Sequence, residues 1–166
     1  MVKSLGIIDS NNKELIFSIE KYFVSKDVDV KVVSADFEMS EFDVVVLTGY
    51  EHRTTIKHNK ILNLYPTLLP AFKDEENPIL ASYLAGVKVS GITVYNVSND
   101  KILAQYPVLI GIDTAFEDLS DELSNIAQKI YPVVIESVLQ DKVFDFNDLF
   151  NSSSCVGSCG GCGGCH

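Results

Sequence analysis

The chain has 166 residues, 46% of them hydrophobic, so it is long enough for one globular domain with its own core but too short for two. Its formal net charge of -10 argues against binding to nucleic acid, whose phosphates require a basic surface. Because no apolar run reaches the ~18 residues that span a bilayer and no hydrophobic signal region opens the chain, we expect a cytoplasmic protein without a membrane partner.

The first fifty residues alternate between strand and helix patterns. A short apolar run at 5–9 predicts a strand, and apolar residues then recur at helical spacing over 15–23. Residues 28–33 alternate like a half-exposed strand, whereas the branched run at 42–47 is typical of a strand buried on both faces. Strand–helix–strand order at this spacing predicts parallel pairing through a right-handed crossover.

The second half of the chain predicts a different pairing. Its elements are a strand over 61–64, a helix over 77–85, strands over 92–97 and 102–110, and a helix over 119–139. The tight turn at 98–100 predicts a hairpin, and Pro132 should kink the last helix or end a turn. We therefore expect an α/β fold with a mixed, mostly parallel sheet flanked by helices, in Rossmann-type order.

The composition changes abruptly after Phe150. A Ser-rich linker begins at Asn151, and the remaining residues are almost wholly Gly, Ser and Cys. We expect a folded body over 1–150 and a cysteine-rich tail over 151–166.

All four cysteines of the chain lie in that tail. They are Cys155, Cys159, Cys162 and Cys165, followed directly by His166. Thiolates two or three residues apart can converge on one ion or cluster, and the glycines between them permit the chain to fold around it. The spacing predicts a site for zinc or an iron–sulfur cluster and does not choose between them. The alternatives are a disordered Gly-rich tail without metal, and redox-active thiols that hand off sulfur or metal.

Four stretches of the body resemble the folate-dependent formyltransferase family, in that family's order. They are the strand and turn at 42–50, the signature ILNLYPTLLP at 61–70 (L-N-I-H-P-S-L-L-P in the family), GITVYNV at 91–97 (G-x-[ST]-V-H-x-V) and IYPVVI at 130–135 (I-Y-P-L-V-I). The resemblance implies the formyltransferase fold. It also implies 10-formyltetrahydrofolate as a ligand and a place in purine biosynthesis.

The resemblance also implies candidates for the catalytic set. An Asn, a His and an Asp surround the formyl group in this family, and Asn63 falls on the Asn, whose amide stabilises the oxyanion. Tyr65 occupies the His position, where a phenol can donate a hydrogen bond but cannot become an imidazolium. The loop that carries the family's Asp is missing here, which leaves Asp100 as a displaced stand-in.

Two turns are candidates for ligand binding by the same resemblance. Ser10, Asn11 and Asn12 occupy the family's phosphate-binding turn, here without glycine and beside the carboxylate of Asp9. The alternative is a simple turn in which Asp9 or Ser10 caps the following helix. His52 and Arg53 occupy the turn that binds the pterin in the family, and a solvated surface loop is the alternative for them.

Two interpretations of function remain. In the first, the protein is an accessory or regulatory module whose degenerate formyltransferase body binds a small-molecule ligand or a protein partner, while its tail holds metal. In the second, it is an active folate-dependent formyltransferase, or a deformylating relative, that uses Asn63 and Tyr65. The missing loop, the His-to-Tyr change and the acidic charge favour the first interpretation. The oligomeric state stays open.

Overall fold

A computed structural model describes residues 2–49 and 55–147. Its elements form one six-stranded sheet in the order β2-β1-β3-β4-β5-β6. The strands are β1 (Lys3–Ile8), β2 (Val28–Val33), β3 (Val44–Leu47), β4 (Ile61–Tyr65), β5 (Val89–Asn96) and β6 (Lys101–Leu109). The helices are α1 (Lys13–Phe23), the 3-10 turn η1 (Met39–Glu41), α2 (Pro78–Leu84) and α3 (Phe116–Leu139). The predicted boundary at residue 150 lies outside the described residues.

The sheet is parallel from β2 to β4 and antiparallel from β4 to β6. β1 pairs in parallel with both β2 and β3, as the strand–helix–strand order predicts. β5 runs antiparallel to β4 and forms a hairpin with β6, which confirms the predicted hairpin. The junction between β3 and β4 is narrow, because only Val45 and Val46 are in register with a β4 residue. The expected mixed α/β sheet is therefore confirmed.

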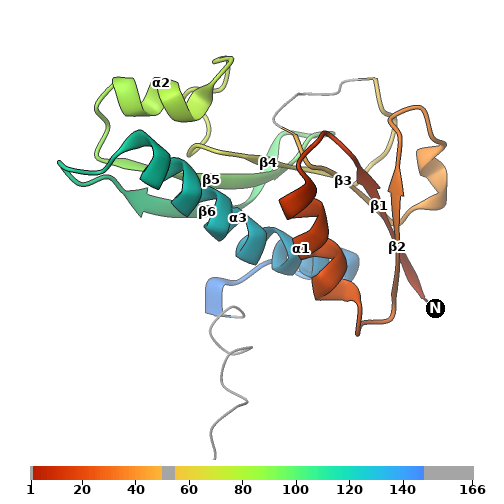
Figure 1. The fold of residues 1–166 in the computed structure, drawn as a ribbon. Helices are drawn as coiled ribbons and strands as arrows, with labels where there is room; N and C mark the ends of the chain where they lie inside the picture. The colour runs from red at the N-terminus through yellow and green to blue at the C-terminus, as the bar shows by residue number, and fades with distance from the viewer. Residues whose placement is uncertain (1, 50–54, 148–166) are drawn as a thin grey trace, which may run out of the picture.

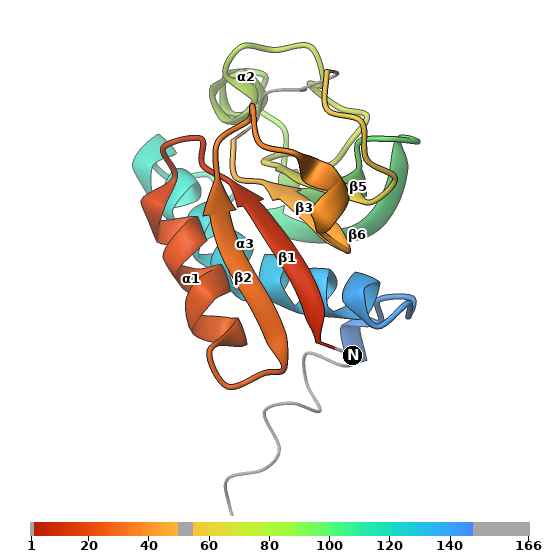
Figure 2. The same cartoon turned by 90° about the vertical axis from the view of Figure 1, so that its right-hand side faces the viewer.

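Two long helices cover one face of the sheet. Figures 1 and 2 show α1 and α3 side by side against it, and the two helices contact each other directly. α1 buries one stripe of side chains because its apolar residues recur every three or four positions: Leu15, Ile16, Ile19 and Phe23. α3 begins at Phe116, earlier than predicted. It continues through Pro132, so the proline does not end it.

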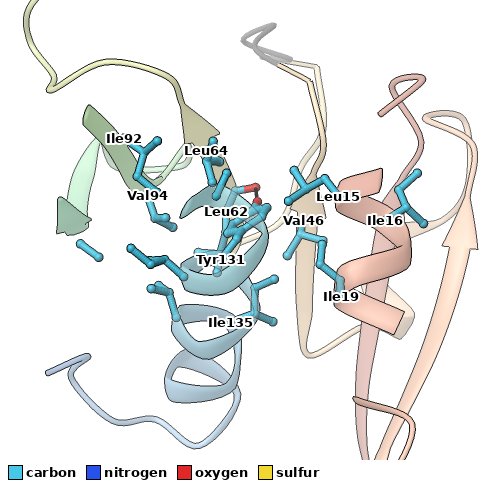
Figure 3. Packing of buried hydrophobic residues seen from close by; sticks show 14 of the residues in the cluster. Leu15, Ile16, Ile19, Val46, Leu62, Leu64, Ile92, Val94, Tyr131 and Ile135 are labelled. Atoms are coloured by element: carbon cyan, nitrogen blue, oxygen red, sulfur yellow. Dashed lines mark hydrogen bonds between the residues drawn. The ribbon is translucent and has the colours of Figure 1, made fainter. Parts of the chain in front are cut away.

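The main core lies between these helices and the sheet. Figure 3 shows branched side chains from α1, β3, β4 and β5 meeting α3 around Tyr131. The Tyr131 side chain is fully buried, and its hydroxyl oxygen lies 2.9 Å from the carbonyl oxygens of both Leu47 and Leu62. The only polar atom of this side chain is thus satisfied by backbone carbonyls of two adjacent strands, β3 and β4.

The other face of the sheet is covered without a long helix among the described residues. η1 and the segment before β4 pack over it, and Figure 2 shows η1 in front of β3. A second apolar cluster forms there from Ile8, Met39, Phe42, Val45, Leu47 and Ile61. No helix in the part of the chain that the structure describes is long and apolar enough to cross a membrane. The two long helices therefore lie on one side of the sheet, and Asn63 and Tyr65 of β4 lie on the other.

Candidate functional site

Asn63 lies in the middle of β4 and is fully buried. Side chains alternate along a strand, so Asn63 points away from the main core, whereas Leu62 and Leu64 point into it. The amide nitrogen of Asn63 donates to the hydroxyl of Tyr95 at 3.3 Å, and its amide oxygen accepts the backbone N–H of Leu64 at 2.9 Å. Both ends of the side-chain amide therefore have partners within the protein.

Tyr65, two residues further on, occupies the same face. Its hydroxyl oxygen lies 2.8 Å from the carbonyl oxygens of both Phe72 and Lys73, so one proton serves two acceptors. The predicted hydrogen-bond donor is therefore present, but it is directed at the backbone of the following loop. Tyr65 fastens that loop to the sheet.

The loop over 66–77 is fastened at a second point by β5 and β6. The Thr93 hydroxyl accepts the N–H of Leu69 at 2.9 Å and donates to the carbonyl of Thr67 at 2.8 Å. The Gln105 amide donates to the carbonyl of Leu69 at 2.9 Å. Gly91 permits this close packing, because a Cβ there would lie 2.7 Å from a methyl carbon of Leu68. The first part of the signature loop is therefore held to the sheet at two places, by Tyr65 and by Thr93 with Gln105.

The β5–β6 turn is as short as the sequence indicates, and hydrogen bonds fix it to the segment before β4. The hydroxyl of Ser98 donates to the carbonyl of His58 at 2.5 Å, and the Asn96 amide donates to the carbonyl of Asn59 at 3.1 Å. Asp100 follows in this turn with a φ of 55° and is exposed to solvent. Its carboxylate lies 3.9 Å from the ammonium of Lys73. The turn therefore presents Asp100 to the signature loop.

These segments enclose an open groove of about 840 Å3. Its apolar residues are Ile56, Ile61 and Val97, and its polar residues include His58, Lys73 and Asp100. The ring of His58 is itself held, because Nε2 lies 2.9 Å from the carbonyl of Phe42 and Nδ1 accepts the N–H of Lys60 at 3.2 Å. With both nitrogens engaged, His58 shapes the wall of the groove. We call this depression the groove below.

The turn after β1, with the three candidate phosphate-binding residues, is occupied by internal hydrogen bonds. The N–H of Asn11 binds the carboxylate of Asp9 at 2.7 Å, and the N–H of Ser10 binds the hydroxyl of Thr48 at 3.1 Å. Asn12 caps α1 by accepting the N–H of Leu15 at 3.1 Å. The prediction that Asp9 or Ser10 caps this helix was therefore wrong, because Asn12 is the capping residue and the Asp9 carboxylate is engaged by Asn11.

Among the described residues, little enclosed space lies beside this turn. The cavity between Asn12, Pro66, Ser124 and Gln128 measures about 20 Å3. A volume of this size holds about one water molecule. The missing side chain of Gly49 permits this close approach, since a Cβ there would lie 2.6 Å from the Cβ of Ser10. The β1 and β3 turns are thus in contact with each other.

The remaining predicted site residues lie outside the described residues. These are His52 and Arg53 of the pterin turn, and Cys155, Cys159, Cys162, Cys165 and His166 of the tail. Over residues 2–49 and 55–147, no group of three or more His, Cys, Asp or Glu side chains is placed to hold a metal ion. The tail prediction therefore stays a prediction.

Comparison with known proteins decides the family. The sequence profile described as formyl transferase matches residues 10–135, which is most of the chain. The chain belongs to the formyl transferase family. The four stretches that resemble the family all lie within this match or end with it, so the expected fold is confirmed along with the family.

Individual members of the family are distant relatives. The chain is 28% identical over 128 residues to phosphoribosylglycinamide formyltransferase of Bacillus subtilis (72% of this chain, 65% of that enzyme). It is 29% identical over 115 residues to formyltetrahydrofolate deformylase of Bacillus subtilis (60% of this chain, 38% of that protein). The crystal structure of phosphoribosylglycinamide formyltransferase from Bacillus halodurans superposes with a TM-score of 0.68 at 20% identity, covering 86% of this chain and 100% of that one. The chain spans less than two thirds of the two Bacillus subtilis proteins.

This member of the formyl transferase family carries two tyrosines on the sheet face where the matching family stretches have histidines. They are Tyr65 and Tyr95. Burial raises the pKa of the Tyr65 phenol, and Asp74 and Glu75 raise it further. Burial also raises the pKa of Tyr95; its hydrogen bond from Asn63 opposes this, while Asp100 adds to it. Both phenols are therefore neutral at physiological pH and neither can serve there as a general base.

Three residues of this site were not among the sequence predictions. Tyr95 is the partner of Asn63, and Lys73 and His58 line the groove. The position of Tyr95 in the G-x-[ST]-V-H-x-V stretch was the available signal, since it replaces a second histidine. Lys73 and His58 carry no such signal, because their places depend on how two loops approach each other.

Proposed function

We propose that this formyl transferase family protein binds a small-molecule ligand in the groove without transferring a formyl group, and so acts as an accessory or regulatory protein. The observation that carries the proposal is the engagement of Tyr65. Its hydroxyl lies at 2.8 Å from two backbone carbonyls of the loop it fastens. A group that must polarise a substrate carbonyl has to direct its proton at the substrate instead.

The state of Asn63 supports the same conclusion. An oxyanion-stabilising amide works when its N–H groups point at the place where negative charge develops. Here the amide nitrogen of Asn63 donates to Tyr95 and its oxygen accepts a backbone N–H. The arrangement orients Asn63 as a cross-strand link between β4 and β5.

The β1 turn, where the family resemblance places the phosphate of the substrate that accepts the formyl group, supports the proposal independently. Transfer to a ribonucleotide requires room for a sugar and a phosphate beside the β1 turn. The cavity next to Asn12 has about 20 Å3, and the N–H groups of Ser10 and Asn11 already have partners. By contrast, the groove lined by Ile56, Ile61 and Val97 measures about 840 Å3. A protein with this asymmetry is suited to binding a donor-type ligand alone.

The ligand that we propose is a one-carbon derivative of tetrahydrofolate. The relatives include a phosphoribosylglycinamide formyltransferase and a formyltetrahydrofolate deformylase, two proteins named for formyl chemistry. The floor of Ile56, Ile61 and Val97 provides apolar contact for a ring system. We place 10-formyltetrahydrofolate, the donor that the family resemblance implies, in this groove.

The proposal is tested by measuring binding and turnover on the same full-length protein. Calorimetric titration with 5-formyltetrahydrofolate is expected to show saturable binding. Absorbance assays with 10-formyltetrahydrofolate are expected to show no loss of the formyl group, with or without glycinamide ribonucleotide. Absence of binding would contradict the proposal.

The alternative is the active enzyme, which the match of Asn63 to the family signature favours. In that case 10-formyltetrahydrofolate is consumed, and Asn63→Ala abolishes the turnover while the ligand still binds. That result would replace the binding proposal with a transferase or deformylase. Turnover that survives Asn63→Ala would point to a contaminating activity.

The cysteine tail adds a separate part to the proposal, which rests on the sequence alone. Four cysteines and His166 within a short Gly-rich segment are proposed to bind zinc or an iron–sulfur cluster. Metal and acid-labile sulfide are measured on anaerobically purified protein beside a version that ends at Ser153. Metal in the full chain and none in the shortened one supports a sensing or docking tail, and none in either contradicts it.

A further inference from the structure

The groove has a charge preference opposite to that of the whole protein. Lys57 and Lys73 line it, and Asp100 is the carboxylate among its described lining residues. The rest of the chain is strongly acidic, because the formal net charge is -10. Cationic side chains gathered in a concave site attract anions even against such a background.

Lys73 is the better placed of the two lysines. Its carbonyl accepts the hydroxyl of Tyr65 at 2.8 Å, so the backbone from which its side chain extends is fixed to the sheet. Its ammonium lies 3.9 Å from the carboxylate of Asp100. That distance is longer than a direct N–H···O hydrogen bond, and both side chains are partly exposed. Such an ion pair is weak and leaves ammonium donors for another carboxylate.

We propose that Lys73 is the specificity-determining residue of the groove and selects a ligand with a flat ring system and a carboxylate. The ring packs on Ile56, Ile61 and Val97, while the ligand carboxylate takes the place of Asp100 beside the Lys73 ammonium. This inference rests on the proposed function, because it presumes a ligand in the groove. It adds which chemical group of the ligand is recognised and by which side chain.

Two probes separate recognition of the carboxylate from recognition of the ring. 5-Formyltetrahydrofolate carries the glutamate carboxylates, and 6-hydroxymethylpterin has the ring without any carboxylate. Calorimetric titration of full-length Lys73→Ala is expected to show about fivefold weaker binding of the first probe, which is about 1 kcal/mol. Binding of the second probe stays unchanged. Asp100→Asn is expected to tighten binding of 5-formyltetrahydrofolate severalfold, since the ammonium then loses its internal partner.

A matched control removes the same charge elsewhere. Lys129→Ala changes an exposed residue of α3, on the face of the sheet opposite to the groove, and is expected to change neither affinity. Thermal unfolding of each variant confirms that the fold is retained.

The outcomes distinguish the inference from the proposed function. Unchanged affinity of Lys73→Ala for 5-formyltetrahydrofolate overturns the inference and leaves the proposed function intact. An equal loss for both probes also overturns it, because Lys73 then shapes the groove without reading a carboxylate. If the unmodified protein binds neither probe, the proposed function fails and the inference fails with it.

Discussion

The amide nitrogen of Asn63 lies 3.3 Å from the phenol oxygen of Tyr95, directly across the antiparallel pair of β4 and β5. Both residues are almost completely buried, so this contact is part of the interior of the protein. In a buried setting a polar pair stabilises when satisfied and becomes costly when one partner is removed. The residue that corresponds to the family's oxyanion-stabilising Asn is thus expected to have a structural role.

Asn63→Ala is expected to destabilise the protein by about 1–3 kcal/mol, because it leaves the Tyr95 hydroxyl without this donor in the interior. The free energy of unfolding is measured by urea denaturation. Replacing a residue that is retained only for chemistry usually lowers activity with little loss of stability. An unfolding free energy equal to that of the unmodified protein would therefore rule out the structural role.

Tyr65→Phe is expected to loosen the loop over 66–77 at a cost of about 1 kcal/mol, the typical net value of one hydrogen bond. Hydrogen exchange of the loop amides should become faster, while the amides of β1 stay protected. Tyr83→Phe is the matched control, since it removes a phenol that donates to the carbonyl of Thr114. If both variants speed the loop amides equally, the Tyr65 hydroxyl does not fasten this loop.

Gly91→Ala is expected to cost more than about 2 kcal/mol or to prevent folding. An added Cβ would lie 2.1 Å from the carbonyl oxygen of Tyr106, so β5 and β6 would have to separate. Gly111→Ala serves as the control, because its nearest described neighbour would be 3.2 Å away at the Thr114 hydroxyl. Thermal unfolding of the two variants compares them, and equal melting temperatures would contradict the close approach of the hairpin strands.

Glu136 is expected to contribute to stability above acidic pH. Burial alone would raise the pKa of Glu136, but hydrogen bonds from Lys26 and Tyr22 lower it overall. A lowered folded-state pKa stabilises the protein above the unfolded value of ~4.3 and loses that effect as pH falls through the folded value. Glu136→Gln should therefore lower the free energy of unfolding by about 1 kcal/mol at neutral pH. Below about pH 4.3 the unfolding free energy of this variant should fall less steeply with pH than that of the unmodified protein.

Urea denaturation at several pH values measures this decline. Every variant should keep part of the acid dependence of its stability, because two other carboxyls also have lowered pKa values. The pKa of Asp43 is lowered mainly by hydrogen bonds from Ser4, and that of Asp141 is lowered by Lys60. Glu122→Gln, an exposed change on the same helix, is the control. Identical pH profiles for Glu136→Gln and the unmodified protein would contradict a lowered pKa of Glu136 in the folded state.

The order and type of the elements could be predicted because local patterns and tertiary packing agree. The branched run of β3 is buried along its whole length, as its sequence indicates, and Asn77 with Pro78 begins α2 as expected. The start of α3 was missed because Ala115 offers no capping side chain. The cap of α1 was missed because each of the four consecutive residues at 9–12 has a side chain that can cap a helix. In the structure Asn12 is the cap, while the Asp9 carboxylate accepts the N–H of Asn11.

The sequence predicted where the candidate site residues lie along the chain, but not which groups they contact. The predicted strand over 61–64 contained Asn63 and ended just before Tyr65, whereas in the structure both residues belong to β4 and lie on one face of it. Their hydrogen bonds depend on residues distant in sequence, so no local pattern could reveal that both polar groups are internally engaged. The role of Lys73 likewise follows from a loop crossing back over the strand, which strand periodicity does not encode.

The narrow pairing of β3 with β4 has a mechanical consequence. Two registered residues join these strands, whereas six join β1 to β2 and eight join β5 to β6. The Tyr131 hydroxyl spans that junction by reaching the carbonyls of Leu47 and Leu62. Under load the sheet is therefore expected to part along this line first, with the parallel half and the hairpin half each staying intact. The Tyr131 hydroxyl is then the side-chain contact that holds these two parts of the sheet together.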